Sequence, residues 1–312
     1  MFDTDPTHLY ALNELCYVQA PKPPSDFDVF WQARYQQAIT LDPCPLLTPS
    51  AIKHTTYDCF ELAYTSTEDF GIKGWVLAPK NTHIKRAIVV GHGYGGREQP
   101  DFDLPMANTA FLFPCFRGLS RSRHPSLPDQ ADAHVLHHVL DPQHYILGKC
   151  VEDLWLAVSA LIKLFPSAQE NIGYMGISFG GGIGVLALPW DLRIKRAHFN
   201  VPSFGHHELR LQIPTFGSAA ALQRLYKQDS RILNTLRYYD AAVAAKYIRV
   251  PTHFALALSD AVVTPIGQFS IYNAVTFDKA LFVLDKGHSE YPRQSEQQQA
   301  LLVELENFFG FL

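Results

Sequence analysis

After residue 84, short apolar runs alternate with helix-compatible segments. We expect the runs to form strands over residues 86–90, 110–116, 172–176, 194–201, 253–258 and 281–284. Each run is apolar at consecutive positions, which is typical of strands buried on both faces. Residues 153–165 instead repeat apolar side chains with helical spacing. The alternation predicts an α/β fold with a mainly parallel, doubly wound sheet that is covered by helices on both sides.

The first 80 residues follow a different pattern. Ser25 is positioned to cap a helix that extends to about Ile39, before three prolines that interrupt it. Residues 60–64 and 72–77 have an extended pattern and flank the turn-forming residues 66–69. This spacing predicts an antiparallel hairpin ahead of the parallel sheet.

A second departure from the alternation lies at about residues 204–249. This segment is rich in Leu, Ala, Gln, Arg and Tyr, and it predicts helices inserted between two strands. We expect the insertion to lie over the strand ends as a cap. The predicted organisation is one domain over residues 1–312, with residues 1–80 as an N-terminal extension and hairpin.

Composition narrows the classes of partner. The chain has 312 residues, 47% of them hydrophobic and 18% charged, with a formal net charge of −4. No basic block favours a nucleic-acid partner, and no apolar run reaches the length of a membrane span. Residues 1–6 are acidic and do not resemble a signal peptide. Five scattered cysteines lack the spacing of a zinc site or a disulfide framework, so we expect a cytoplasmic globular protein.

The strongest candidate for chemistry is the pentapeptide Gly176-Ile177-Ser178-Phe179-Gly180, which follows an apolar strand and precedes further glycines. A strand-to-helix turn that exposes a serine hydroxyl needs strained backbone angles and little bulk on either side. We therefore predict Ser178 as a nucleophile. The pentapeptide is also compatible with a plain small-residue turn. A nucleotide-binding loop at residues 180–184 is disfavoured, because these glycines lack G-x-G-x-x-G in the right place, lie too late in the chain for the usual first strand-to-helix turn, and no P-loop pattern occurs.

A nucleophilic serine needs a histidine to accept its proton and a carboxylate to orient that histidine. In α/β-hydrolases the chain order is serine, acid, histidine. Among the histidines after Ser178, His288 alone follows the last predicted strand, and Asp260 directly follows the preceding one. Of the alternatives, Asp240 lies in the insertion, whereas Asp278 and Asp285 flank the final strand. Ser178, Asp260 and His288 are therefore the predicted triad.

An oxyanion hole needs two hydrogen-bond donors. One is expected to be the backbone N–H of Phe179, and the second should come from the glycine-rich loop around Tyr94. Two interpretations of Tyr94 remain open. It donates a hydrogen bond to the oxyanion through its backbone N–H, or it is a structural residue whose ring packs against the sheet. His92 in the same loop is expected to brace it.

A group of histidines and aspartates resembles a metal cluster in composition. Its members are Asp132, His134, His137, His138, Asp141 and His144. The glutamate of an HExxH pattern is missing and a proline interrupts the segment, so a solvated loop without metal is the expectation. The predicted chemistry requires no cofactor.

Several segments, together with these motifs, carry a family resemblance over nearly the whole chain. They are residues 26–31, 72–79, 93–97, 140–145, 235–240, 258–260, 264–265 and 272–273. They resemble the acetyl xylan esterase/cephalosporin C deacetylase family, carbohydrate esterase family seven, of the α/β-hydrolases. The resemblance implies that Ser178, Asp260 and His288 form the triad and that Tyr94 and Phe179 form the oxyanion hole. It implies a small-molecule, short-chain ester, such as an acetyl ester of a sugar, as substrate, and it leaves a homo-oligomer open.

Three of the family's signature positions are altered in this chain. Leu119 stands where the family has a glutamine after Arg-Gly, Phe179 replaces the glutamine after the nucleophile, and Ser289 replaces the glutamate after the histidine. None of these changes removes a member of the triad, and Phe179 keeps its backbone N–H.

The same residues are compatible with four alternative functions: a peptidase, a thioesterase, an esterase for larger acyl groups, and a non-catalytic hydrolase fold that binds a ligand.

Overall fold

A single mixed sheet organises the computed structural model, which describes residues 11–312; the acidic residues 1–6 lie outside this range. Within the described residues, nine strands pair in the order β1-β2-β3-β5-β4-β6-β7-β8-β9. The strands are β1 Leu46–Pro49, β2 Tyr57–Thr65, β3 Gly71–Pro79, β4 Arg86–Gly91, β5 Thr109–Pro114, β6 Ile172–Ile177, β7 Ile194–Asn200, β8 Thr252–Ala257 and β9 Lys279–Leu284.

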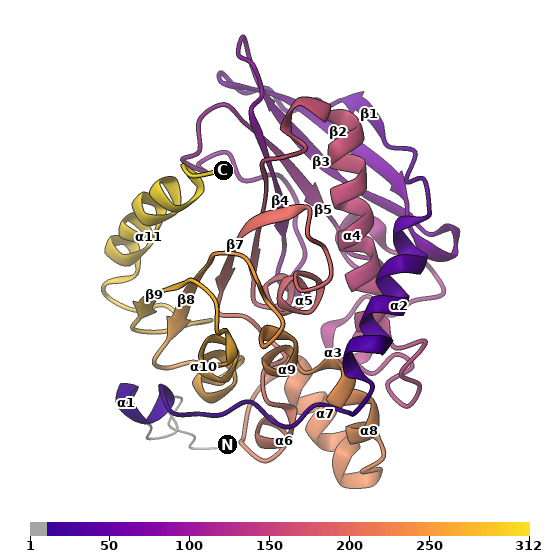
Figure 1. The fold of residues 1–312 in the computed structure, drawn as a ribbon, viewed down its shortest axis with the longest axis vertical. Helices are drawn as coiled ribbons and strands as arrows, with labels where there is room; N and C mark the ends of the chain where they lie inside the picture. Colours follow the sequence, from indigo (N-terminus) through magenta and orange to yellow (C-terminus); the bar gives the residue numbers. More distant parts are fainter. Residues whose placement is uncertain (1–10) are drawn as a thin grey trace.

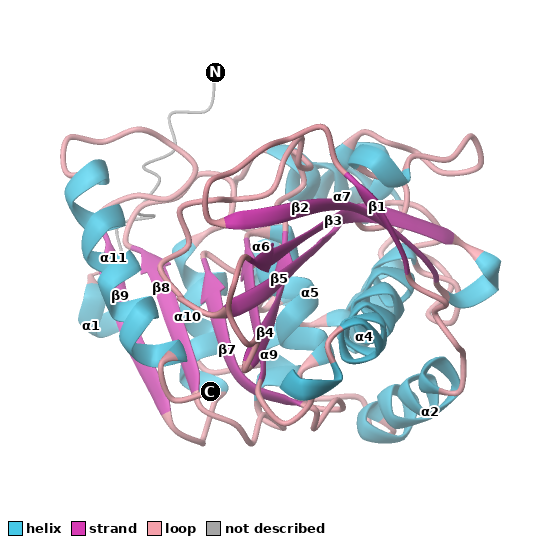
Figure 2. Cartoon of the chain, turned by 90° about the horizontal axis from the view of Figure 1, so that it is seen from above, coloured by secondary structure: helices cyan, strands magenta, loops and turns pink. Residues whose placement is uncertain are grey.

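Strand direction divides the sheet into two parts (Figure 2). The strands β1, β2, β3 and β5 pair antiparallel, whereas β5, β4, β6, β7, β8 and β9 are parallel neighbours. The predicted parallel core and the predicted hairpin are therefore confirmed, with strand ends within two residues of those predicted from residue 84 onward. The edge strand β1 was not predicted, because Pro45 before it and Pro49 at its end mark a break in a sequence pattern, although proline is tolerated at a sheet edge.

The helices fill the intervals between strands. They are α1 Leu12–Leu15, α2 Phe27–Ile39, α3 Ala131–His134, α4 Ile146–Leu164, α5 Phe179–Ala187, α6 His207–Arg210, α7 Gly217–Gln228, α8 Ile232–Leu236, α9 Ala241–Ala245, α10 Pro265–Ala274 and α11 Gln294–Phe309. Short 3₁₀ turns lie at Thr67–Asp69, Ser120–Ser122, Pro166–Ala168 and Arg237–Tyr239.

Two helix predictions need correction. The predicted cap Ser25 is wrong: Asp26 occupies the N-cap of α2 without a side-chain capping bond. The Asp26 carboxylate instead accepts the hydroxyl of Tyr238, 2.7 Å away, so a tertiary contact uses the capping group. Helix α4 begins seven residues before the predicted start at residue 153. Nearly all of its first turns are buried, so no polar face marks its beginning in the sequence.

Alternate residues of the central strands enter two separate cores. On β4, Ala87 and Val89 pack with α2, α4, α5 and α10 in the larger core. Ile88 and Val90 pack in a smaller core with Leu301 and Leu305 of α11. Figure 1 shows α11 on one side of the sheet and α2, α4, α5 and α10 on the other. The doubly wound arrangement predicted from the sequence is therefore confirmed.

The helices α6, α7, α8 and α9 lie within the predicted insertion at about residues 204–249. Helix α7 packs against α3, and α9 packs against α5 and α10. The insertion is thus attached to the helix that follows the predicted nucleophile. Among the helices of residues 11–312, none has the length and apolar character needed to cross a membrane.

Candidate active site

Ser178 lies in a tight turn between β6 and α5. Its φ of 53° and ψ of −112° fall where side chains are rarely found, which is the strain expected of a nucleophile turn. Gly180 permits the turn, because a Cβ there would lie 2.6 Å from the backbone carbon of Gly91. The Gly180 N–H donates to the carbonyl oxygen of His92 at 2.9 Å. The turn is therefore locked against the glycine-rich loop after β4.

His288 and Asp260 complete a continuous row of hydrogen bonds with Ser178. The Nε2 atom of His288 lies 2.9 Å from Ser178 Oγ, and its Nδ1 atom lies 2.8 Å from Asp260 Oδ2. A carboxylate accepts only, so Nδ1 carries the proton and Nε2 accepts the serine hydroxyl. The structure thus brings together the three residues that the sequence ordering singled out, in the geometry that proton transfer from serine requires.

Asp260 is held from several directions. Its side chain is buried, and Oδ1 accepts the backbone N–H groups of Val262 and Val263 at 2.9 Å each. Oδ2 accepts the Gln268 side-chain amide at 3.1 Å in addition to the histidine. The Gln268 oxygen in turn accepts the Ala257 N–H at 2.9 Å. The carboxylate is therefore fixed in place by the end of β8 and by α10.

The predicted oxyanion donors lie beside the nucleophile. Phe179 is the first residue of α5, where a helix has free N–H groups. Within residues 11–312, neither the Phe179 N–H nor the Tyr94 N–H takes part in the hydrogen bonds of turns and loops. His92 braces the loop as expected: it accepts the Phe116 N–H at Nε2 and donates from Nδ1 to the carbonyl oxygen of Gly93. Neither backbone donor is therefore committed to an acceptor in these turns and loops.

The Tyr94 hydroxyl contacts His134, at 3.3 Å from its Nδ1 atom. His134 Nε2 lies 3.0 Å from the carbonyl oxygen of Arg117 and must donate to it. Burial lowers the pKa of His134 to about 4, so the ring is neutral and its Nδ1 accepts the tyrosine proton. The Tyr94 ring also packs on Phe179, with centroids 4.1 Å apart. The side chain of Tyr94 is therefore an anchor for the loop.

A cavity of about 360 Å³ opens at the nucleophile. Its walls come from the loop after β4, the nucleophile turn, the acid and histidine loops, and the insertion. The lining residues are Gly93, Tyr94, Gly95, Ala131, Ile177, Ser178, Ser203, Arg210, Gly217, Ser218, Val262, Val263 and His288. A small ester group held here has Ser178, His288 and the predicted donor residue Tyr94 in the walls around it.

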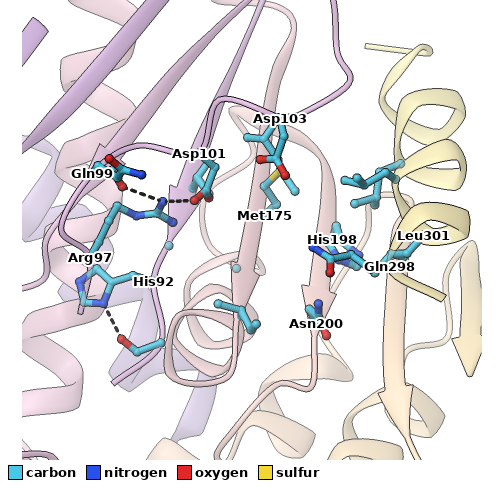
Figure 3. Close-up of a pocket in the computed structure, with 18 of the residues that line it drawn as sticks. His92, Arg97, Gln99, Asp101, Asp103, Met175, His198, Asn200, Gln298 and Leu301 are labelled. Atoms are coloured by element: carbon cyan, nitrogen blue, oxygen red, sulfur yellow. Dashed lines mark hydrogen bonds and ion pairs between the residues drawn. The ribbon is translucent and has the colours of Figure 1, made fainter. Parts of the chain in front are cut away.

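A second cavity of about 500 Å³ adjoins the first and shares Gly93 and Ile177 with it. Figure 3 shows Arg97 and Asp101 on the side of the loop after β4, facing Gln298 and Leu301 of α11. Arg97 and Asp101 form an ion pair at 2.7 Å. None of the three predicted triad residues lines this cavity, so the smaller cavity is the candidate active site.

The altered family positions and the histidine-rich segment have structural surroundings of their own. Leu119 is buried in the larger core, and the Ser289 hydroxyl donates to the carbonyl oxygen of Gly287. His144 pairs with Asp141 at the surface, whereas His134 is buried beside Tyr94. No group of three or more metal-binding side chains occurs in the part of the chain that the structure describes.

Sequence reasoning missed two polar residues of the site. Gln268 orients the acid from α10, and Arg210 reaches the cavity from α6. Neither residue belongs to a motif. The only sequence signal is a glutamine in the otherwise apolar start of a helix and an arginine in the insertion, and such residues are usually solvated.

Comparisons with known proteins agree with this architecture. A family model described as acetyl xylan esterase (AXE1) matches residues 8–305. The chain is 23% identical over 279 residues to the acetyl esterase Axe7A of Xylanibacter ruminicola, covering 83% of this chain and spanning 62% of that protein's length.

Two solved structures are similar over their full length. Acetyl xylan esterase 1 from Thermoanaerobacterium sp. JW/SL YS485 has a TM-score of 0.83 at 18% identity, covering 95% of this chain and 99% of its own. The acetyl xylan esterase from Paenibacillus sp. R4 has a TM-score of 0.81 at 22% identity, with the same coverage. At these identities the structural likeness supports the fold.

Proposed function

The chain belongs to the acetyl xylan esterase family, which confirms the resemblance seen in the sequence, and from this premise we propose that it hydrolyses short-chain, chiefly acetyl, esters. The single observation that carries the proposal is the row of hydrogen bonds from Ser178 through His288 to Asp260. Acetylated sugars and related small esters are the proposed substrates. The cytoplasm is the proposed location, which the free state of the five cysteines supports.

The proposed mechanism has two halves. His288 removes the Ser178 proton while the serine oxygen attacks the ester carbonyl carbon. Negative charge develops on the carbonyl oxygen, where the backbone N–H groups of Phe179 and Tyr94 stabilise it. The tetrahedral intermediate expels the alcohol, which takes its proton from His288, and an acetyl-serine remains.

Water then hydrolyses the acyl-enzyme. His288 accepts a proton from a water molecule, whose oxygen attacks the acetyl carbonyl, and acetate leaves as Ser178 recovers its proton. Asp260 stabilises the cationic imidazole in both halves and keeps its Nδ1 protonated. The roles need only this chain's residues and no cofactor.

The decisive test replaces Ser178 with alanine. We expect Ser178→Ala to lower kcat for 4-nitrophenyl acetate by about 10⁶-fold, the scale found when the nucleophile of a serine triad is removed. A fluorophosphonate probe should label the unaltered protein with one equivalent and leave the variant unlabelled. Full activity in Ser178→Ala would refute the assignment, and a folded but unlabelled, inactive unaltered protein would support the non-catalytic alternative.

A substrate series distinguishes the enzymatic alternatives. Because the chain belongs to the acetyl xylan esterase family, we expect kcat/KM to be highest for the acetate and to fall along 4-nitrophenyl esters of increasing chain length. An aminoacyl 4-nitroanilide and an acetyl thioester serve as controls for peptidase and thioesterase activity. A preference for the anilide, the thioester or a long acyl chain would contradict the proposal.

A further inference from the structure

Arg210 carries a buried positive charge that forms no salt bridge among residues 11–312; its guanidinium carbon lies 5.9 Å from the centre of the Phe204 ring. Its side chain is 4% exposed, and neither Nε nor Nη1 has a hydrogen-bond partner among residues 11–312. Other buried arginines are paired: Arg34 with Glu152 at 2.5 Å, and Arg117 with Asp153 at 2.6 Å. Burying an ion without a direct counter-charge is costly, so a guanidinium without a salt bridge calls for a ligand.

The nearby acidic side chains are already engaged. Asp240 accepts the backbone N–H groups of His206, His207 and Ala242. Asp260 is held by His288 and by the contacts described above. Within the described residues, neither carboxylate forms a salt bridge with Arg210. Burial lowers the pKa of Arg210 to about 10, which still leaves the guanidinium charged near neutral pH.

Arg210 belongs to the wall of the cavity at the nucleophile. Arg210 lines this cavity together with Ser178 and His288, and it is the only lysine or arginine among the lining residues. The hydroxyl-bearing Ser203 and Ser218 lie in the same wall. A planar guanidinium pairs well with a carboxylate through two parallel hydrogen bonds. One cation balances one carboxylate but leaves a phosphate dianion half neutralised.

We propose that Arg210 is a specificity-determining residue that binds a carboxylate carried by the ester substrate. The inference rests on the proposed esterase function of Ser178 and names the substrate class within it: short-chain esters with one negative charge. The carboxylate belongs either to the acyl part or to the alcohol part of the ester, and the two sources are separated by experiment.

The test compares charged and neutral esters that are otherwise matched. The acyl arm uses 4-nitrophenyl hemisuccinate against its methyl ester, and the alcohol arm uses 4-acetoxybenzoate against 4-acetoxybenzamide. In the arm that carries the natural carboxylate, we expect Arg210→Met to lower the charged-to-neutral ratio of kcat/KM by about 10- to 100-fold, as for lost hydrogen bonds to a charged group. Most of this change should appear in KM, and Arg210→Lys should retain part of the ratio.

Arg224→Met is the matched control. Arg224 is an exposed arginine on the adjacent helix α7 that pairs with Asp132, so its removal should leave the ratio unchanged. An unchanged ratio in both arms of the Arg210→Met variant would overturn the proposal, as would an equal change in the Arg224→Met control. Inorganic phosphate tested as an inhibitor should bind the unaltered protein more weakly than monomethyl succinate does; tighter binding of phosphate would overturn the carboxylate assignment.

Stability and binding give readouts that do not depend on turnover. Removing a buried charge without a salt bridge should leave the melting temperature of Arg210→Met equal to or higher than that of the unaltered protein. If Arg210 were kept for structure, the substitution would lower the melting temperature.

Binding of monomethyl succinate and of 4-acetoxybenzoate to the Ser178→Ala protein, measured by calorimetry, should be weakened when Arg210→Met is added. If no ester is hydrolysed but this binding difference holds, the esterase proposal fails while the carboxylate site stands. If esters are hydrolysed without any binding difference, the carboxylate site fails while the esterase proposal stands.

Discussion

At the scale of single residues, the hydrogen-bond roles of two histidines determine how Tyr94 can act. His92 and His134 are both buried, and burial lowers the pKa of each to about 4. Both are therefore neutral, with one donor and one acceptor nitrogen assigned by their partners. Because His134 accepts the hydroxyl of Tyr94, the hydroxyl is occupied away from the reacting ester. Tyr94 should then serve the oxyanion hole through its backbone N–H.

Tyr94→Phe tests this assignment. We expect kcat for 4-nitrophenyl acetate to fall by less than about 10-fold, because loss of an actual oxyanion donor costs about 10²–10³ and the backbone N–H remains. Steady-state kinetics measure the effect. Tyr94→Ala, which also removes the ring packed on Phe179, should lose more. A drop of several hundred-fold in Tyr94→Phe would show that the hydroxyl itself stabilises the oxyanion.

The residues that could be predicted from sequence are those whose place is set by strand order. Ser178, Asp260 and His288 each follow a recognisable apolar strand, so their meeting at one end of the sheet follows from topology. Gln268 and Arg210 reach the site from helices, and a helical pattern does not tell which neighbour a polar side chain meets. Their partners, or lack of partners, emerge only from packing.

At the scale of elements, the contact between α5 and the loop after β4 sets the geometry of the site. The Gly180 N–H bonds to His92, and Phe179 contacts the rings of Tyr94 and Phe116. Phe179 occupies the position where the resembling family has a glutamine, so an aromatic cluster orders the loop in this chain.

Strand positions were predictable from the sequence because the runs of buried residues that form them are short and bounded by polar or turn-forming residues. The start of α4 was not, since its first turns are buried and lack helical alternation.

Gly180→Ala tests the close contact between these elements. The new Cβ would lie 2.6 Å from the backbone carbon of Gly91 and 2.7 Å from the His92 carbonyl oxygen, so α5 and the loop must separate. We expect a loss of unfolding free energy of about 1–3 kcal/mol, typical of overpacking, together with a fall in kcat of at least 10-fold as the two oxyanion donors move apart. Urea unfolding and ester kinetics measure both quantities.

Gly71→Ala is the matched control for this substitution. A Cβ at Gly71 meets no atom within 4 Å, so stability and kcat should stay close to those of the unaltered protein. Normal activity in Gly180→Ala would show that the loop tolerates displacement. An equal loss in both variants would show that the effect is not specific to the contact.

At the scale of the whole molecule, three buried histidines surround one aromatic cluster that joins the loop after β4, the nucleophile helix and the insertion. The rings of His92 and His134 lie 6.4 and 6.1 Å from that of Phe179, and Phe204 connects Phe179 to His207. These contacts link elements that are distant in the chain, so they could not be predicted from a local sequence pattern. The site and the fold therefore depend on the same neutral histidines.

This arrangement predicts that acid destabilises the protein. Burial lowers the pKa from the ordinary 6.5 to about 4 for His92 and His134, and to about 3 for His207. Between pH 6.5 and 4 the unfolded chain binds protons that the folded chain refuses, so the free energy of unfolding falls as pH falls through this window. Each histidine contributes about 1 kcal/mol per pH unit. Asp240 opposes them below pH 6, because burial raises its pKa to about 6 and the folded state takes up its proton first.

Together, these three histidines and Asp240 should give a loss of about 2 kcal/mol per pH unit as pH falls from 6 toward 4. His198 adds to this loss, because burial also holds its pKa well below the ordinary value. Urea unfolding at pH 7, 6 and 5 measures this slope, and esterase activity should disappear along with the folded state. His207→Gln keeps a donor for the Tyr239 carbonyl oxygen but cannot titrate, so it should make the slope shallower. The same change at the exposed His83 should leave the slope as it was. Equal stability at pH 7 and pH 5 would contradict this prediction. It would mean that the buried histidines do not govern acid unfolding and can be protonated while the protein stays folded.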